Sequence, residues 1–299
     1  RSPHIRVPKM ILGIDHVALS CSNMEDDLRS VQRSGLEVIF VHRDLPNSIT
    51  KKPFLSSYQT VHAAAYCQAV RGISLEITAH GAPVEEAASW YQVLMEGLPE
   101  NQGPFKGRLP CSSEIWEKTL ECQNAQAAVW RPFKAQFWYD ASKSAAGPES
   151  GSAKRELLIR ALLVPVTEIE RSLLFWTEGL KFRVMKRGKE NGQAWIHLSW
   201  RSPIPKWSLE VILSETKETL GVPYLDRPGF PCLAFISNDL VSDRLQLIQC
   251  AAQNISEISD HIINGKALKV AFARGPSQEL VELIEIAKKP VQKADGEIQ

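Results

Sequence analysis

The chain has 299 residues, of which 44% are hydrophobic and 23% are charged, with 35 basic and 34 acidic side chains. This composition excludes a disordered chain and gives enough material for a large core or two domains. A net charge of +1 provides no general field that would steer the chain to nucleic acid or an anionic membrane. No apolar run approaches the roughly 20 residues that span a bilayer, and residues 1–9 lack the apolar core of a signal peptide.

These properties favour a cytoplasmic protein whose partner is a small-molecule ligand, with no nucleic acid and no membrane, and they leave an oligomer open. The six cysteines lie at positions 21, 67, 111, 122, 232 and 250, with no CxxC pair and no spacing typical of a structural zinc site. We therefore expect reduced and mostly buried thiols.

The first predicted unit is a strand, a helix and three further strands. Residues 11–21 have β-forming composition, and Asn23 can cap a helix over 24–34 that Gly35 ends. Three strands are then expected at residues 36–41, 60–70 and 73–78. The long stretch 44–58 contains two prolines and many hydroxyl side chains, so we expect a loop at the mouth of a pocket.

The middle of the chain has a less regular pattern. Apolar side chains at helical spacing predict an amphipathic helix over residues 84–98. A second helix is expected at 114–122 and strand structure at 127–139, so this part can be interpreted as a fourth, eroded unit. Residues 141–154, rich in Ser, Ala, Gly and Pro, are the best candidate for a linker.

The pattern of the first unit returns twice in the second half. His16 precedes Gly35 by 19 residues, and Arg160 precedes Gly179 by 19. Helices are expected after Thr167 as far as 176 and, capped by Asn238 or Asp239, as far as 253; the expected strands are 181–186, 194–200, 209–213, 229–236, 267–273 and 279–286. Arg160 to Glu210 and Cys232 to Glu282 are both 50 residues apart, which indicates one structural unit used repeatedly.

Several motifs resemble those of the vicinal-oxygen-chelate superfamily, which includes glyoxalases, bleomycin-resistance proteins and extradiol dioxygenases. They are Ile14-Asp15-His16-Val17-Ala18-Leu19, Leu75-Glu76-Ile77 and the closing run from Gly275 to Glu285. The resemblance covers most of the chain outside residues 82–155. It implies an α+β fold of repeated βαβββ modules that form two open curved mixed sheets. The corresponding domains are 10–140, with its second module eroded, and 155–288.

In this superfamily, four positions on the first and last strands of paired modules hold one divalent metal. His16 and Glu76 keep the expected residue types in the first module, and imidazole and carboxylate suit Fe, Mn, Zn or Ni. The resemblance therefore implies a metal at His16 and Glu76 and a lyase, isomerase or dioxygenase activity. Residues 81–196 contain no histidine, so the middle of the chain supplies no second imidazole, although Cys111 or Glu114 can contribute a ligand.

The second half departs from the superfamily pattern. Arg160 and Cys232 stand where histidines are expected, whereas Glu210 and Glu282 keep the glutamate positions. We expect Arg160 to lie between the two carboxylates in place of a metal, because a guanidinium forms bidentate, charge-assisted hydrogen bonds. These four residues, together with His62, form the predicted substrate pocket.

Two hypotheses about function remain. One is an enzyme that uses a metal at His16 and Glu76 for enolate-type or oxygenation chemistry on a small organic substrate. The other is a metal-free small-molecule-binding or scaffold protein that kept the fold and lost the ligands, since fold alone does not decide function. The sequence contains no GxSxG, phosphate-binding glycine loop or HExxH motif that would point elsewhere.

Overall fold

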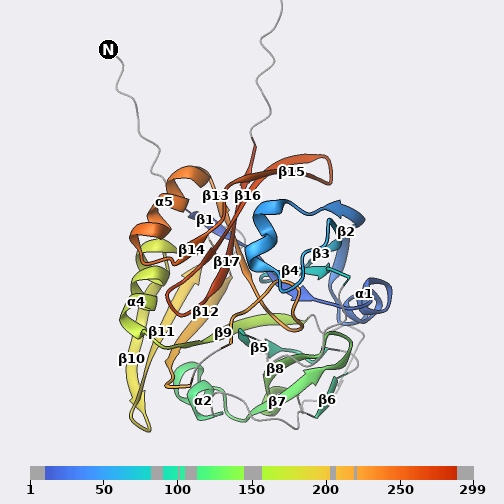
Figure 1. Ribbon diagram of the computed structural model, residues 1–299. Coiled ribbons are helices and arrows are strands. Elements are labelled where there is room, and N and C mark those ends of the chain that lie inside the picture. Colours follow the sequence, from blue (N-terminus) through green and yellow to red (C-terminus); the bar gives the residue numbers. More distant parts are fainter. Residues whose placement is uncertain are drawn as a thin grey trace, which may run out of the picture.

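The structure is a computed structural model that describes residues 11–81, 90–99, 102–104, 113–144, 157–202, 207–218 and 221–287. Two mixed sheets and a few short helices make up this part of the chain (Figure 1). The expected α+β architecture of two open mixed sheets is confirmed. None of the helices in the described ranges is long and apolar enough to cross a membrane.

The first sheet joins the two ends of the chain. Its strand order is β14-β16-β17-β13-β1-β4-β3-β2, and β15 pairs with β16. The strands are β1 (Ile11–Ser20), β2 (Glu37–Pro46), β3 (Val61–Gln68), β4 (Ser74–Ala79), β13 (Leu233–Ser237), β14 (Asn254–Ile255), β15 (Ser259–Ile263), β16 (Lys266–Arg274) and β17 (Leu280–Ile286). β1 lies at the centre, parallel to β4 and antiparallel to β13.

The second sheet contains the middle of the chain, in the order β10-β11-β12-β9-β5-β8-β7-β6. Its strands are β5 (Gln92–Glu96), β6 (Gln102–Pro104), β7 (Ala125–Trp130), β8 (Ala135–Asp140), β9 (Leu158–Val166), β10 (Arg183–Glu190), β11 (Gln193–Arg201) and β12 (Ser208–Glu215). The order β10-β11-β12-β9 matches β2-β3-β4-β1 of the first sheet. In both sheets, the first strand of the repeated unit therefore lies beside its last strand.

Strand pairing crosses the expected division of the chain into residues 10–140 and 155–288. β1 pairs with β13 and β5 pairs with β9, so each sheet takes strands from both halves. The two predicted domains therefore do not each form a separate sheet. Local sequence patterns specify where strands form. They do not specify which strands pair, because tertiary packing selects the partners.

Capping side chains mark the starts of α1 and α5. Asn23 accepts hydrogen bonds from the backbone N–H groups of Glu25 and Asp26 at the start of α1 (Met24–Arg33), and Gly35, with φ of 91°, follows its end. Asp239 caps α5 (Leu240–Gln249). The remaining helical segments are η1 (Ile49–Phe54), α2 (Glu114–Leu120), η2 (Arg131–Phe133), α3 (Ala141–Ser144), α4 (Ile169–Leu174) and the π-helical turn η3 (Phe175–Gly179).

The predicted helix over residues 84–98 is wrong in its second part. Gln92–Glu96 is the strand β5, between β8 and β9, whereas residues 84–89 lie outside the described ranges. Tyr91, Val93, Leu94 and Met95 are all at most 2% exposed. A strand buried on both faces shows a continuous apolar run, and helical spacing within such a run carries no information.

A helix covers one face of the second sheet. Ile115, Trp116 and Leu120 of α2 pack in one buried apolar cluster with Ala161 and Leu163 of β9 and with side chains of β5, β8, β11 and β12. Ala161 pairs with Glu210 just as Ala18 pairs with Glu76 in the first sheet. The face that α2 fills is thus the equivalent of the face that carries His16 and Glu76.

Candidate metal centre

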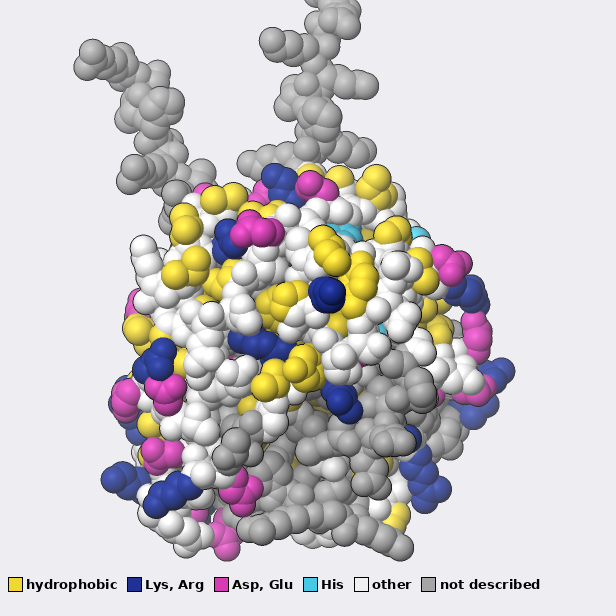
Figure 2. Space-filling model, in the orientation of Figure 1, with side chains coloured by type: hydrophobic (Ala, Val, Ile, Leu, Met, Phe, Trp, Pro, Cys, Tyr) yellow, Lys and Arg dark blue, Asp and Glu magenta, His cyan; other side chains and the backbone are white. Residues whose placement is uncertain are grey.

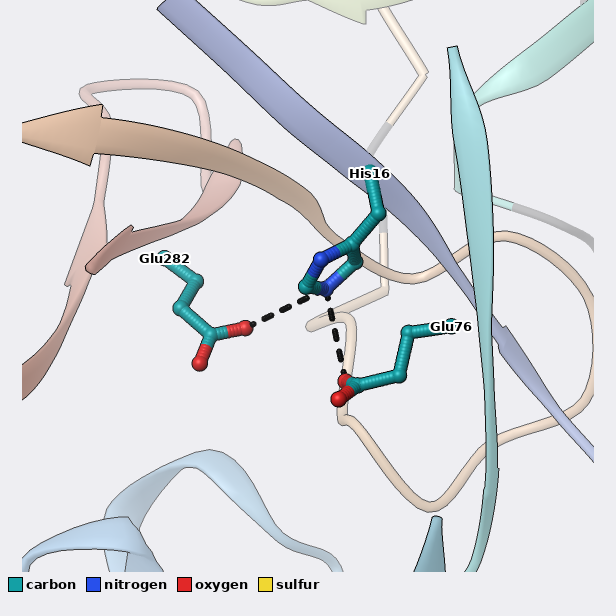
Figure 3. A group of neighbouring side chains, drawn as sticks. All are labelled: His16, Glu76 and Glu282. Carbon is teal, nitrogen blue, oxygen red and sulfur yellow. Dashed lines mark ion pairs between the residues drawn. The ribbon is translucent and has the colours of Figure 1, made fainter. Parts of the chain in front are cut away.

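Three side chains from two ends of the chain converge on one face of the first sheet. His16 comes from β1, Glu76 from the neighbouring β4, and Glu282 from β17, two strands away on the other side (Figure 3). The register of β1 against β13 shifts between Ile14 and Val17, which marks a bulge at this point of β1. Bulges re-aim side chains locally, and this one lies where the imidazole turns toward the two carboxylates.

The geometry of the three side chains is compact. His16 Nε2 lies 3.3 Å from Glu76 Oε2 and 3.6 Å from Glu282 Oε2. One ligand atom from each residue falls within 4.8 Å of the other two. His16 is 2% exposed, and its Nε2 makes no hydrogen bond in the described structure. A buried imidazole nitrogen and two carboxylates that converge on one point are a donor arrangement that can hold a cation.

Asp15 fixes the imidazole from the other side. Its carboxylate lies 2.8 Å from His16 Nδ1. Since Asp15 accepts the Nδ1 proton, Nε2 is the nitrogen that faces Glu76 and Glu282, and it offers a lone pair there once its own proton is lost. A carboxylate behind a histidine ligand typically sets its tautomer and ring orientation in metal sites.

The charges of the three groups are strongly coupled. Burial lowers the pKa of His16, but the charge of Glu76 and the acceptor carboxylates of Asp15 and Glu282 outweigh this effect, so the pKa is raised well above its usual value. Burial raises the pKa of Glu76, yet the neighbouring His16 lowers it to about 2. Two carboxylates on one buried site thus require a positive charge, which the imidazolium supplies when no cation is bound.

Two cavities meet at these carboxylates. A cavity of about 570 Å³ and another of about 330 Å³ are both lined by Glu76, Glu282, Ile263 and Val270. A small molecule in either cavity therefore reaches the convergent carboxylates. The segment 44–58 was expected at a pocket mouth, and its residues Asn47, Ser48 and Lys51 line the larger cavity.

Two further residues of the predicted pocket lie near this centre. Cys232 is fully buried beside it; burial raises the pKa of its thiol, and Sγ contacts the carbonyl of Leu233. His62 lines the larger cavity and stacks on His80, with ring centroids 5.0 Å apart. Burial and, less strongly, the charge of Lys51 lower the pKa of both imidazoles to about 3. These histidines are therefore neutral at physiological pH.

Arg160 and Glu210 do not lie at this centre. Arg160 donates a hydrogen bond to the carbonyl of Leu120 at the end of α2, and Glu210 binds His197 Nε2 at 2.8 Å and Ser199 Oγ at 3.0 Å. The prediction that Arg160 lies between Glu210 and Glu282 is wrong. β9 and β12 belong to the second sheet and β17 to the first, so equal spacing along the chain did not bring them together.

Sequence reasoning overlooked several residues of the centre. Asp15 precedes His16 directly, and an acid beside a candidate ligand was the available signal. His80 follows the end of β4, and no pattern indicated a role for it, whereas Lys51 lies in the segment 44–58 that was expected at a pocket mouth. Of the additional ligands considered, Cys111 lies outside the described residues, and Glu114 begins α2 on the second sheet.

No protein-family model matches the chain, and neither does any curated protein sequence. Solved structures match over nearly the full length. Glyoxalase I from Zea mays is 12% identical, with 91% of this chain and 92% of that chain covered and a TM-score of 0.53. A putative dioxygenase from Bacillus subtilis subsp. subtilis str. 168 is 11% identical, with coverage of 94% and 87% and a TM-score of 0.52. The chain therefore has the vicinal-oxygen-chelate fold.

Proposed function

We propose that the chain is a metal-dependent enzyme that acts on a small organic substrate, with His16, Glu76 and Glu282 holding a divalent cation. The observation that carries the proposal is the convergence of the buried His16 Nε2 with two carboxylates, whose ligand atoms all lie within 4.8 Å of one another. Two carboxylates that converge at a buried site need a positive charge between them, and a divalent cation would supply it in place of the proton on the imidazole.

The donor set agrees with the metals expected from the sequence. One imidazole and two carboxylates suit Fe, Mn, Zn or Ni, and three protein ligands leave coordination positions for a substrate. A divalent cation there would supply Lewis-acid stabilisation to the enolate or oxyanion of a substrate with adjacent oxygens. The chain's own contribution is to orient the imidazole through Asp15 and to offer two cavities that approach the carboxylates from different sides.

A metal-free binding protein is the second candidate, and Cys232 favours it. This residue replaces an imidazole that the superfamily pattern expects, and its sulfur is not among the convergent ligand atoms of the described residues. The corresponding face of the second sheet is filled by α2, and the described residues there include no convergent group of metal-ligating side chains. In this alternative the cavities bind a small molecule, and His16 keeps its proton between the carboxylates.

Metal analysis separates the two candidates. Protein purified without chelator or histidine tag is compared with His16→Ala and Glu282→Gln, and His197→Ala serves as a control from the equivalent pair in the second sheet. We expect wild type and His197→Ala to contain a single equivalent of metal and the other two variants to lose it. Equal metal content in wild type and His16→Ala, or none in any sample after exposure to Fe, Mn, Zn and Ni, contradicts the enzyme proposal.

A further inference from the structure

The two cavities on either side of the convergent carboxylates differ in chemistry. The larger one is lined by polar side chains, among them Ser48, Lys51, His62, Ser259 and His261. The smaller one has a larger share of apolar and aromatic side chains, among them Ile39, Phe40, Tyr66, Ile236, Leu268 and Ile284, although Asp15, Gln68 and Lys266 also line it. A molecule that occupies both would therefore meet more polar side chains at one end and more apolar ones at the other.

Lys51 supplies the positive charge of the polar cavity. Its Nζ lies 5.3 Å from the centre of the Phe272 ring, and its charge contributes to lowering the pKa values of Glu76, His62 and His261. No carboxylate of the described residues forms an ion pair with Lys51. Asp260 also lines this cavity, but its side chain is exposed to solvent. Lys51 thus faces the cavity without an ion-pair partner of its own among the described residues, although Glu76 and Glu282 line the same cavity.

The segment that carries Lys51 is fixed in place. Phe54 at the end of η1 is 1% exposed and packs against Phe272 of β16. Asp226 accepts hydrogen bonds from the backbone N–H groups of Ser56 and Ser57. Figure 2 shows apolar side chains, with a basic side chain among them, gathered over η1 and beside β15. The ammonium group is therefore presented to the cavity by a packed element, so binding does not have to order the backbone of this segment.

We infer that the substrate of this site is a small amphipathic organic anion. Its carboxylate or phosphate group binds Lys51 in the larger cavity, its apolar body occupies the smaller cavity, and its central oxygens face Glu76 and Glu282. This inference rests on the proposed function for the role of the central oxygens. The anion subsite itself depends only on Lys51 and the polar cavity.

Calorimetric binding of three probes tests the inference. The probes are 3-phenyllactate, phenyl phosphate and the uncharged 3-phenylpropane-1,2-diol, each with wild type, Lys51→Met and Lys52→Met. Lys52 is the neighbouring exposed lysine and does not line the cavity, so it is the matched control. We expect at least one anion to bind wild type and Lys52→Met, and Lys51→Met to bind it about 10- to 100-fold more weakly, as for loss of a charged hydrogen bond. The anion that binds more tightly shows whether the subsite prefers a carboxylate or a phosphate.

Three outcomes overturn the anion subsite: neither anion binds, Lys51→Met binds as wild type does, or the diol binds as tightly as the anions. Titrations with metal-free and metal-loaded samples keep this test separate from the proposed function. If anion binding depends on Lys51 but the protein never takes up metal, the metal proposal is wrong and the anion subsite is supported. If the protein takes up metal but anion binding does not depend on Lys51, the anion subsite is wrong and the metal proposal is supported. Melting temperatures of the variants show that each is folded.

Discussion

Cys232 and His16 occupy matching positions in the first sheet: each lies two residues before the alanine that pairs with a glutamate of the centre. Ala18 pairs with Glu76, and Ala234 pairs with Glu282. The two sides of the centre therefore correspond in register and differ in chemistry, with an imidazole on one side and a buried thiol on the other.

Replacement of Cys232 by alanine tests whether that correspondence extends to metal binding. The sulfur lies outside the group of convergent ligand atoms, and burial keeps its thiol protonated, so we expect Cys232→Ala to retain full metal stoichiometry. Deletion of a buried sulfur should lower the free energy of unfolding by about 1–2 kcal/mol. Elemental analysis and urea unfolding provide the readouts; loss of metal in Cys232→Ala would make the thiol a ligand.

Asp15 should control metal affinity without binding the metal. Its hydrogen bond to His16 Nδ1 orients the ring, and loss of such a partner typically weakens metal binding about 10- to 100-fold. Asp15→Ala should therefore show this loss in a competition titration with a fluorescent chelator. Asp26→Ala, which removes an exposed acid on α1, should bind as wild type does. An unchanged affinity in Asp15→Ala contradicts the positioning role.

The stability of the metal-free protein should fall as the pH rises above about 6.5. The pKa of His16 is raised in the folded state, so its contribution is fully present below the unfolded value and is lost as the pH passes through the raised value. Metal binding should show the opposite trend, because the cation competes with the proton on Nε2. The pKa of Asp27, about 6, lies below this range.

Melting temperatures between pH 6.5 and 9, with and without metal, measure both trends. His16→Gln should flatten the dependence of the metal-free protein. A metal-free wild type whose melting temperature rises over this range contradicts the assigned charge state.

The sequence was sufficient for most elements of the first sheet, because their signals are local. Asn23 caps the start of α1 and Gly35 follows its end, as the sequence predicted. The resemblance to the vicinal-oxygen-chelate superfamily indicated His16 and Glu76 as metal ligands and Glu282 as a residue of the substrate pocket. The assembly of the centre was not predictable, since it depends on β1 pairing with β13, and no local pattern specifies which of several similar strands become neighbours.

Arg160 illustrates the same limit. Arg160 lies at a shift in the register of β9 against β5, and His16 lies at a shift in the register of β1 against β13. The alignment of these two residues was therefore reasonable. Yet α2 fills the face on which Arg160 lies, and the guanidinium binds the end of this helix. The helix itself was expected from its apolar spacing, but nothing in that spacing indicates which sheet face it covers.

Asp226 should determine whether the loop that carries Lys51 stays in place. Its buried carboxylate accepts hydrogen bonds from Ser56 and Ser57, and bonds to a charged group contribute about 1.5–3 kcal/mol each. We expect Asp226→Ala to be destabilised by at least this amount and to be cut by trypsin at Lys51 or Lys52 faster than wild type. Mass spectrometry of the early fragments identifies the site. If cleavage there is no faster than in Asp26→Ala, the carboxylate does not hold the loop.

The second sheet should depend on α2 for packing rather than for chemistry. Trp116 is fully buried against Trp138, so Trp116→Ala should cost about 3–5 kcal/mol in the free energy of unfolding, as for other large-to-small changes in a core. Arg160→Met removes one hydrogen bond from a half-buried side chain to the end of α2 and should cost about 1 kcal/mol. Both variants should keep the metal content of wild type, because neither residue contacts the first sheet's convergent carboxylates. Urea unfolding with elemental analysis of the same samples measures both effects. A loss from Arg160→Met as large as that from Trp116→Ala would mean that the guanidinium compensates buried carboxylates after all.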